Sequence, residues 1–234
     1  MMKNGSVKYL LVAVVILTGV GVGLGLSKIS GRRLSQGAST SLASQPSQAA
    51  DAASLKEKAK RAGGHYVGGE SPARVGEFNS LAGLTARSAA VIIGIPQENR
   101  TSLTPDGRSV TIDYKVRVEY VYKGALREGN IVTVSLPGGR IGFDDGSTAE
   151  VRTPWFRKME SGKAYALFLT GGRSGAFVTT GNAQGLFEIP TTKDSRVVKT
   201  HSGNPGDPIW KYNGMDVKAF LAELRQATGK ASKR

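Results

Sequence analysis

The stretch SVTIDYKVRVEYVY, residues 109–122, decides the fold because apolar and polar side chains alternate along it. The apolar set is Val110, Ile112, Tyr114, Val116, Val118, Tyr120 and Tyr122. The polar set is Thr111, Asp113, Lys115, Arg117 and Glu119. Successive side chains of a β-strand point to opposite faces of a sheet, so a period of two predicts one strand with a buried face and a solvated face.

A second strand is predicted just before this one, from Ser88 to Pro96, where aliphatic side chains dominate. Pro105-Asp106-Gly107 supplies a turn between the two strands. The pair is therefore expected to form a long hairpin, and its polar loop, Gln97 to Gly107, is expected to present side chains to solvent.

Five further apolar runs follow, and each is bounded by Gly, Pro, Asp or Asn. They are Ile131–Leu136, Ala149–Arg152, Tyr165–Leu169, Phe177–Thr180 and Leu186–Ile189. Seven short strands at this spacing predict a closed or nearly closed sheet. The fold class expected for residues 80–190 is therefore mostly β, an OB-like small β-barrel.

An amphipathic helix is predicted at residues 216–228, inside a C-terminal region, 191–234, that is otherwise expected to be a loop and a basic tail. Asp216 can cap the start of this helix, and Gly229 can end it. The apolar face comprises Val217, Phe220, Leu221 and Leu224. A face of this kind predicts that the helix docks against the sheet.

The most hydrophobic segment is Leu10–Leu26, seventeen uncharged residues of which eleven are Leu, Ile or Val. As a helix it would span about 25 Å, slightly less than the roughly 30 Å hydrocarbon core of a bilayer. Residues 1–27 are therefore either a signal anchor, which enters the membrane through residues 10–26, or a signal peptide cleaved near Gly25-Leu26-Ser27. The first alternative predicts a single-pass cell-membrane protein with an extracytoplasmic domain, and the second predicts a secreted or periplasmic one.

Residues 28–79 are expected to form a flexible basic and polar tether, because Ser, Ala, Gly, Gln and Lys predominate there. A segment with so few large apolar side chains cannot bury enough surface to offset the ordering of its chain. Within the tether, Ala52–Ala62 is compatible with a short polar helix that lacks an apolar face.

The formal net charge of +14 would suit an anionic partner such as nucleic acid. Most of this charge lies outside the predicted barrel. Residues 1–79 carry 10 Lys or Arg against 4 Asp or Glu, and residues 191–234 carry 9 against 4, whereas residues 80–190 carry 13 against 10. No basic face with interleaved aromatic residues accompanies the charge, so a nucleic-acid partner is not expected.

The order of several short motifs between residues 85 and 190 resembles uncharacterised bacterial exported domains related to the tissue-inhibitor-of-metalloproteinases (netrin-like) OB fold. The motifs are Lys123-Gly124, Gly129–Val134, Pro137-Gly138-Gly139, Gly162–Leu169 and Gln184–Phe187. They consist of turns and strand residues, so the resemblance implies a fold more than an activity. Inhibitors in that superfamily chelate the protease zinc through an N-terminal cysteine. This chain has no cysteine, so that mechanism does not carry over.

No catalytic or metal-binding constellation is visible in the sequence, and no cofactor is predicted. The only histidines, His65 and His201, lie apart in Gly-rich polar sequence, where both are expected to be solvated. Asp144 and Asp145 are expected to form a turn, and Glu150 is expected to be a solvated strand residue. Acid–base chemistry would require the fold to bring Asp145 and Glu150 into one cleft.

The strongest candidate for a binding surface is an aromatic pair, Trp155 and Phe156, which Arg157 follows. Exposed aromatic side chains often anchor a partner. The alternative is that Trp155 and Phe156 close the open end of the barrel. Arg140 and Arg173, each beside glycines, are candidate contacts on neighbouring loops.

The function expected from these features is a non-catalytic binding module for a protein, a peptide or a glycan, held at the membrane or exported beyond it. One alternative is a hydrolase that uses carboxylates. Another is a structural component of an envelope assembly. The last rests on Gly19, Gly21, Gly23 and Gly25, whose spacing lets transmembrane helices pack closely.

Overall fold

The computed structural model describes residues 53–69, 77–172, 175–191 and 196–229. The hydrophobic segment 10–26, predicted to be an anchor or signal peptide, lies outside these residues, and so do most of the predicted tether and the basic tail. None of the helices in the described part is long and apolar enough to cross a membrane.

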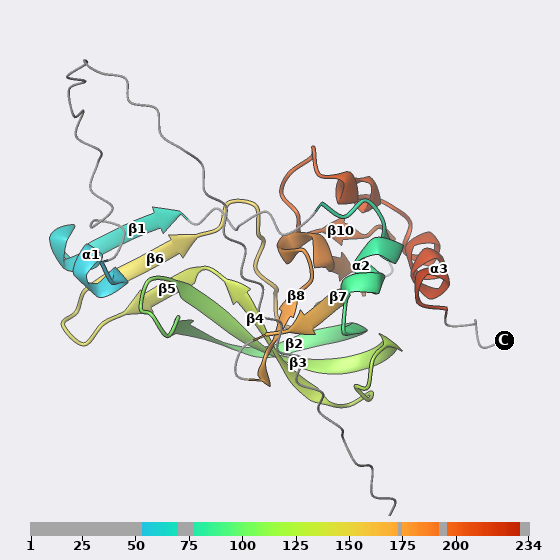
Figure 1. Cartoon of the computed structure of the whole chain (residues 1–234), viewed down its shortest axis with the longest axis horizontal. Coiled ribbons are helices and arrows are strands. Elements are labelled where there is room, and N and C mark those ends of the chain that lie inside the picture. The colour runs from blue at the N-terminus through green and yellow to red at the C-terminus, as the bar shows by residue number, and fades with distance from the viewer. Residues whose placement is uncertain (1–52, 70–76, 173–174, 192–195, 230–234) are drawn as a thin grey trace, which may run out of the picture. The chain divides into compact units, whose positions relative to one another are not determined.

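The described part is mostly β-structure with a helix at its C-terminal end (Figure 1). The strands are β1 (His65–Gly69), β2 (Ala90–Leu103), β3 (Val110–Lys123), β4 (Ile131–Pro137), β5 (Gly139–Gly142), β6 (Thr148–Arg152), β7 (Ala164–Gly171), β8 (Phe177–Thr179), β9 (Leu186–Ile189) and β10 (Lys199–Thr200). The helices are α1 (Leu55–Arg61), α2 (Leu81–Arg87) and α3 (Val217–Thr228), with short 3-10 helices η3 (Asn182–Gly185) and η4 (Pro208–Tyr212). The seven strands predicted from the sequence are confirmed as β2, β3, β4, β6, β7, β8 and β9.

Five strands form a closed ring of pairings in the order β2, β3, β4, β8, β7 and back to β2. All of these pairs are antiparallel except β4 with β8, which are parallel and pair at Val134 and Phe177. β9 and β10 continue the sheet beyond β7. Alternate side chains of the ring strands, such as Ile112 and Leu167, form one buried cluster, which therefore fills the inside of the ring.

The alternating face of β3 contributes to all three buried clusters of the described part. Val110 packs beside α1, Ile112 to Val118 line the ring, and Tyr122 joins a cluster beneath α2 and α3. A single long strand thus connects three small cores. This role explains why residues 109–122 carry so much of the fold.

The cluster that Tyr122 joins lies against β7 and β9 and is covered by α2 and α3 (Figure 1). The docking of α3 is confirmed, because Phe220 and Leu224 are fully buried and the Phe220 ring lies 5.1 Å from that of Phe187. The cap predicted at Asp216 is also confirmed, since its carboxylate accepts hydrogen bonds from the backbone N–H groups of the first turn. The helix ends, as predicted, at Gly229.

Residues 53–69 of the predicted tether are folded, and the short helix expected at Ala52–Ala62 is confirmed as α1, but this helix has a buried side and a strand follows it, which corrects the expectation of a flexible segment there. Helix α1 buries Leu55 and Ala59, one turn apart, against Val110 and the strand β6. The next strand, β1, pairs in parallel with β6 and forms a three-stranded sheet with β6 and β5 (Figure 1). Its first residue, His65, is exposed as expected, yet its Nδ1 lies 2.8 Å from Thr148 Oγ1. Two buried residues in one helix are too few to be recognised as an apolar face in the sequence. They are enough to dock α1, because β3 and β6 supply the rest of the cluster.

The hairpin loop expected at residues 97–107 is also shorter than predicted. β2 continues to Leu103 and pairs with β3 as far as Val110, so the turn comprises only residues 104–109. Side chains at 97–100 are exposed, which made this half of the strand look like a loop. Strand pairing depends on hydrogen bonds between backbone groups. The polarity of the side chains indicates only whether they are buried in a core.

Candidate functional site

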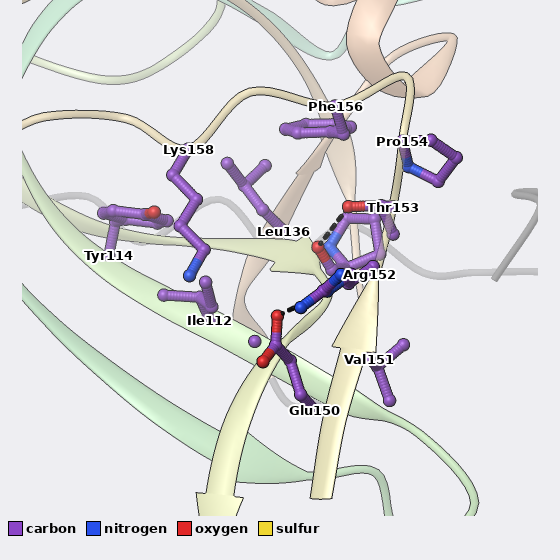
Figure 2. Close-up of a pocket in the computed structure, with 12 residues that line it drawn as sticks. Ile112, Tyr114, Leu136, Glu150, Val151, Arg152, Thr153, Pro154, Phe156 and Lys158 are labelled. Carbon is purple, nitrogen blue, oxygen red and sulfur yellow. Dashed lines mark hydrogen bonds and ion pairs between the residues drawn. The ribbon is translucent and has the colours of Figure 1, made fainter. Parts of the chain in front are cut away.

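A pocket of about 200 Å³ opens where β4 ends, between the ring and the loop that follows β6 (Figure 2). Strands β3 and β4 provide an apolar floor, in which Ile112 and Leu136 are direct cross-strand neighbours. β6 and residues 153–158 provide the wall. The full lining is Ile112, Tyr114, Leu136, Pro137, Gly139, Glu150, Val151, Arg152, Thr153, Pro154, Phe156 and Lys158.

Gly139 allows the chain to pass from β4 into β5 directly beside the pocket floor. Its φ of +130° lies in a region that side-chain-bearing residues rarely adopt. A Cβ atom there would come within 3.0 Å of Ile112 Cγ1 and 3.1 Å of Thr101 Cγ2. The Pro137-Gly138-Gly139 motif therefore lets β5 approach the hairpin so closely that β6, the next strand, can form the wall.

The loop that carries Phe156 is held in place by the segment that follows β10. Phe156 forms an isolated antiparallel bridge with Ser202, and the Gly203 N–H donates to the Trp155 carbonyl at 3.2 Å. His201 Nδ1 lies 2.8 Å from the carbonyl oxygen of Arg157. Because a carbonyl can only accept, this nitrogen carries the proton. The C-terminal part of the chain thus positions one wall of the pocket.

His201 is buried, which corrects the expectation that it lies in a solvated loop. Only 3% of the residue is exposed, and its ring packs edge-on against Tyr165 at a centroid distance of 5.2 Å. Burial lowers the pKa of the imidazole below its ordinary value of 6.5, so the ring is neutral at pH 7. The polar residues on either side of His201 suggested that it is exposed. In the structure, the hydrogen bond to the Arg157 carbonyl and the contact with Tyr165 offset the cost of burying the imidazole.

The rim of the pocket carries two cations, Arg152 and Lys158, and one carboxylate, Glu150, while a third cation, Arg140, lies near Glu150 on β5. Arg152 Nε donates to Glu150 Oε1 at 2.8 Å, and Arg140 on β5 lies directly across from Glu150 in the strand register. Arg152, followed by the fields of Arg140 and Lys158, holds the pKa of Glu150 below its usual range. Figure 2 shows the Lys158 side chain reaching from the loop toward Ile112 and the Glu150 carboxylate. The rim therefore has an excess of positive charge.

Tyr114 adds a hydroxyl to an otherwise apolar floor. Burial raises its pKa to about 12, while the backbone N–H of Met159 donates to the phenol oxygen. The phenol consequently keeps its proton at neutral pH and can donate it to an acceptor in the pocket. This hydroxyl lies on the same side of the pocket as Lys158 in Figure 2.

The structure separates the residues that the sequence singled out for binding. Phe156 packs against the ring cluster and lines the pocket, whereas 49% of Trp155 is exposed. The backbone carbonyl of Arg157 accepts the hydrogen bond from His201 that helps to hold the loop. Arg140 faces Glu150, and Arg173 lies outside the described residues. The two residues of the aromatic pair therefore do not share one environment, because Phe156 packs inward and Trp155 is exposed.

Sequence reasoning missed Tyr114, Arg152 and Lys158 as pocket residues. Tyr114 belongs to the alternating apolar set, where a core role explains it fully. Lys158 follows the aromatic pair in sequence, which was the one available indication. Arg152 and Glu150 lie two residues apart on β6, on the same face of the strand, and this spacing could have suggested the ion pair.

The other carboxylates predicted to lie in a turn are engaged with α1 rather than with the pocket. Asp144 pairs with Lys56, and Asp145 pairs with Lys60 at 3.3 Å. Hydrogen bonds from Ser147 are the main reason that the pKa of Asp145 falls to about 2. Within the described part, no group of three or more His, Cys, Asp or Glu side chains is arranged to hold a metal ion.

No protein-family model matches this sequence, and no curated protein is significantly similar to it. Any function assigned to the pocket therefore rests on its own geometry.

Proposed function

We propose that this protein is a non-catalytic binding module, exported or tethered to a membrane, whose OB-like domain binds part of a protein, peptide or glycan in the pocket beside Phe156. The single observation that carries the proposal is the pocket itself. It is open, about 200 Å³ in volume, floored by apolar side chains and rimmed by a few polar ones. An apolar interior with a few polar groups at its edge is the usual make-up of a ligand site, and this volume suits one small group of a larger ligand.

The strand pairings support the OB-like part of the proposal. Numbered within the ring, the strands pair in the order 1-2-3-5-4 and back to 1, and only the third and fifth are parallel. A five-stranded Greek-key ring is the architecture of an OB fold. The motifs that resemble the netrin-like domains lie largely on these strands and their turns, so the resemblance and the pairing order favour the same fold.

Exposed Trp155 next to the pocket supports a larger partner than a free small molecule. Trp155 and Phe156 are adjacent on a loop that residues 201–203 hold by backbone contacts. An exposed, positioned tryptophan beside an apolar pocket is a common arrangement of interface anchors. A partner could place one group in the pocket and pack a neighbouring group on Trp155.

The alternatives named from the sequence gain no specific observation. The pKa values of Asp145 and Glu150 are both lowered, whereas a carboxyl that acts as a general acid needs a raised pKa. The glycine-spaced segment behind the assembly hypothesis lies outside the described residues. The binding proposal is therefore the one that the described residues support.

Peptide and glycan arrays probed with the full chain in a non-ionic detergent would test the proposal. The matched variants are Leu136→Phe, which fills the pocket from its floor, and Ile131→Ala, which changes an exposed side chain on the same strand, β4. We expect ligands retained by wild type and Ile131→Ala to be lost by Leu136→Phe and weakened by Trp155→Ala. Ligands retained equally by Leu136→Phe would remove the pocket from the proposal.

A further inference from the structure

We infer that the pocket binds a carboxylate attached to an apolar group of about the size of a benzene ring. This inference rests on the proposed function, since it names the ligand class of the same site. It combines three properties of the pocket: the charge of its rim, the volume and lining of its interior, and the hydroxyl of Tyr114.

The charge of the rim favours an anion. Glu150 is the only carboxylate among the lining residues, and Arg152 already occupies one of its oxygens at 2.8 Å. Arg140 and Lys158 add two more positive charges that both act on Glu150. Glu150 cannot balance both Arg152 and Lys158, and Arg140 adds to the positive excess from β5, so a second anion would be attracted to the space between Lys158 and Arg152.

The presence of Glu150 also limits how much negative charge the ligand can carry. A phosphate or a polyanion would bring two or more negative charges against this carboxylate, which remains ionised because its pKa is lowered. A ligand with one carboxylate matches the excess positive charge of the rim without strong repulsion from Glu150. A cationic ligand is disfavoured, because it would meet Lys158 and Arg152 at the rim.

The interior sets the size of the apolar part. A dry cavity of about 150 Å³ can hold benzene, and this pocket is slightly larger at about 200 Å³. Ile112, Leu136 and Phe156 supply apolar and aromatic surface for such a group. Tyr114, kept protonated by a pKa of about 12, can donate a hydrogen bond to the carboxylate, and Lys158 reaches from the loop on the same side of the pocket.

Two sources share this chemistry: the C-terminal residue of a peptide with an aromatic or aliphatic side chain, and a free aryl-substituted carboxylic acid. A peptide end is compatible with exposed Trp155, which could contact the preceding residue. The probes below are chosen to separate the two.

The test is an NMR titration of the full chain in a non-ionic detergent with two probes of the same shape, N-acetyl-L-phenylalanine and its amide. We expect the acid to bind at least tenfold more tightly than the amide, because only the acid carries a negative charge that can pair with the cations of the rim. Lys158→Met should reduce this preference about tenfold. Lys218→Met, which removes the same charge from an exposed position on α3, should leave it unchanged.

The outcomes separate this inference from the proposed function. If the amide or phenethylamine binds as tightly as the acid, and Leu136→Phe abolishes that binding, the pocket binds ligands but the carboxylate assignment is wrong. If neither probe binds wild type more tightly than it binds Leu136→Phe, the carboxylate assignment is wrong, and the proposed function is then decided by the arrays alone. An N-acetylated tetrapeptide ending in Phe that binds more tightly than N-acetyl-L-phenylalanine identifies a peptide C-terminus, and equal affinities identify a free acid.

Discussion

Replacing Gly139 by alanine should destabilise the protein strongly, because this glycine permits the close approach that forms the pocket wall. Its φ of +130° costs a side-chain-bearing residue about 1–3 kcal/mol. The added Cβ would lie 3.0–3.2 Å from side-chain carbons of Ile112, Thr101 and Val110, all on the hairpin. Such overpacking costs about 1–3 kcal/mol more. The expected loss in the free energy of unfolding is therefore about 2–6 kcal/mol.

Urea denaturation of the full chain, followed by tryptophan fluorescence, measures this loss. With a slope of about 2 kcal/mol per molar urea, the midpoint should fall by roughly 1–3 M. Gly142→Ala is the matched control on the same strand, β5: its φ is ordinary and a Cβ there meets nothing within 4 Å. Its midpoint should stay within experimental error of wild type. A Gly139→Ala protein as stable as Gly142→Ala would refute the role assigned to the close approach.

Three further predictions concern buried groups. The pKa of His201 is lowered in the folded state, so the unfolded chain binds a proton below pH 6.5 that the folded chain does not. Stability should therefore be full above pH 6.5 and fall as the pH drops below it. Urea midpoints across this range should show the decline in wild type and not in His201→Phe. Burial and, to a lesser extent, a hydrogen bond to Glu223 raise the pKa of Tyr212 to about 12. Stability should fall between pH 10 and 12, because the unfolded chain loses this proton before the folded chain does. The same measurement should show a smaller fall in Tyr212→Phe. Leu224→Ala should cost about 2–5 kcal/mol in urea unfolding, because this side chain lies on the buried face of α3. Lys218→Ala, on the exposed face of the same helix, should change stability by less than about 0.5 kcal/mol. Equal effects would contradict the docking of α3 on the sheet.

The long strands were predictable because their side chains repeat with a period of two over many residues. β3 shows this pattern over its whole length, and α3 shows the corresponding helical pattern with a cap at Asp216. The short elements had no such redundancy. β1 and β5 have five and four residues and are rich in glycine, and α2 has only seven residues, so neither period could be recognised.

The pocket was predictable only in part. The aromatic pair pointed to the correct loop, but it did not show that Phe156 turns inward and Trp155 outward. Adjacent residues on a loop have no fixed relation to the core until other segments hold the loop, and here residues 201–203 do so from a distant part of the sequence.

The sequence by itself determined that residues 88–189 contain a series of strands and that one amphipathic helix follows them, because periodicity and turn residues act locally. It also determined the overall basic charge. Only the tertiary structure decided that β3 serves three cores, that His201 is buried and that Glu150 and Lys158 line one pocket with Arg140 across from Glu150 on β5. The physical reason is that pairing between distant strands sets these contacts, and the register of such pairs depends on the whole sheet rather than on any single segment.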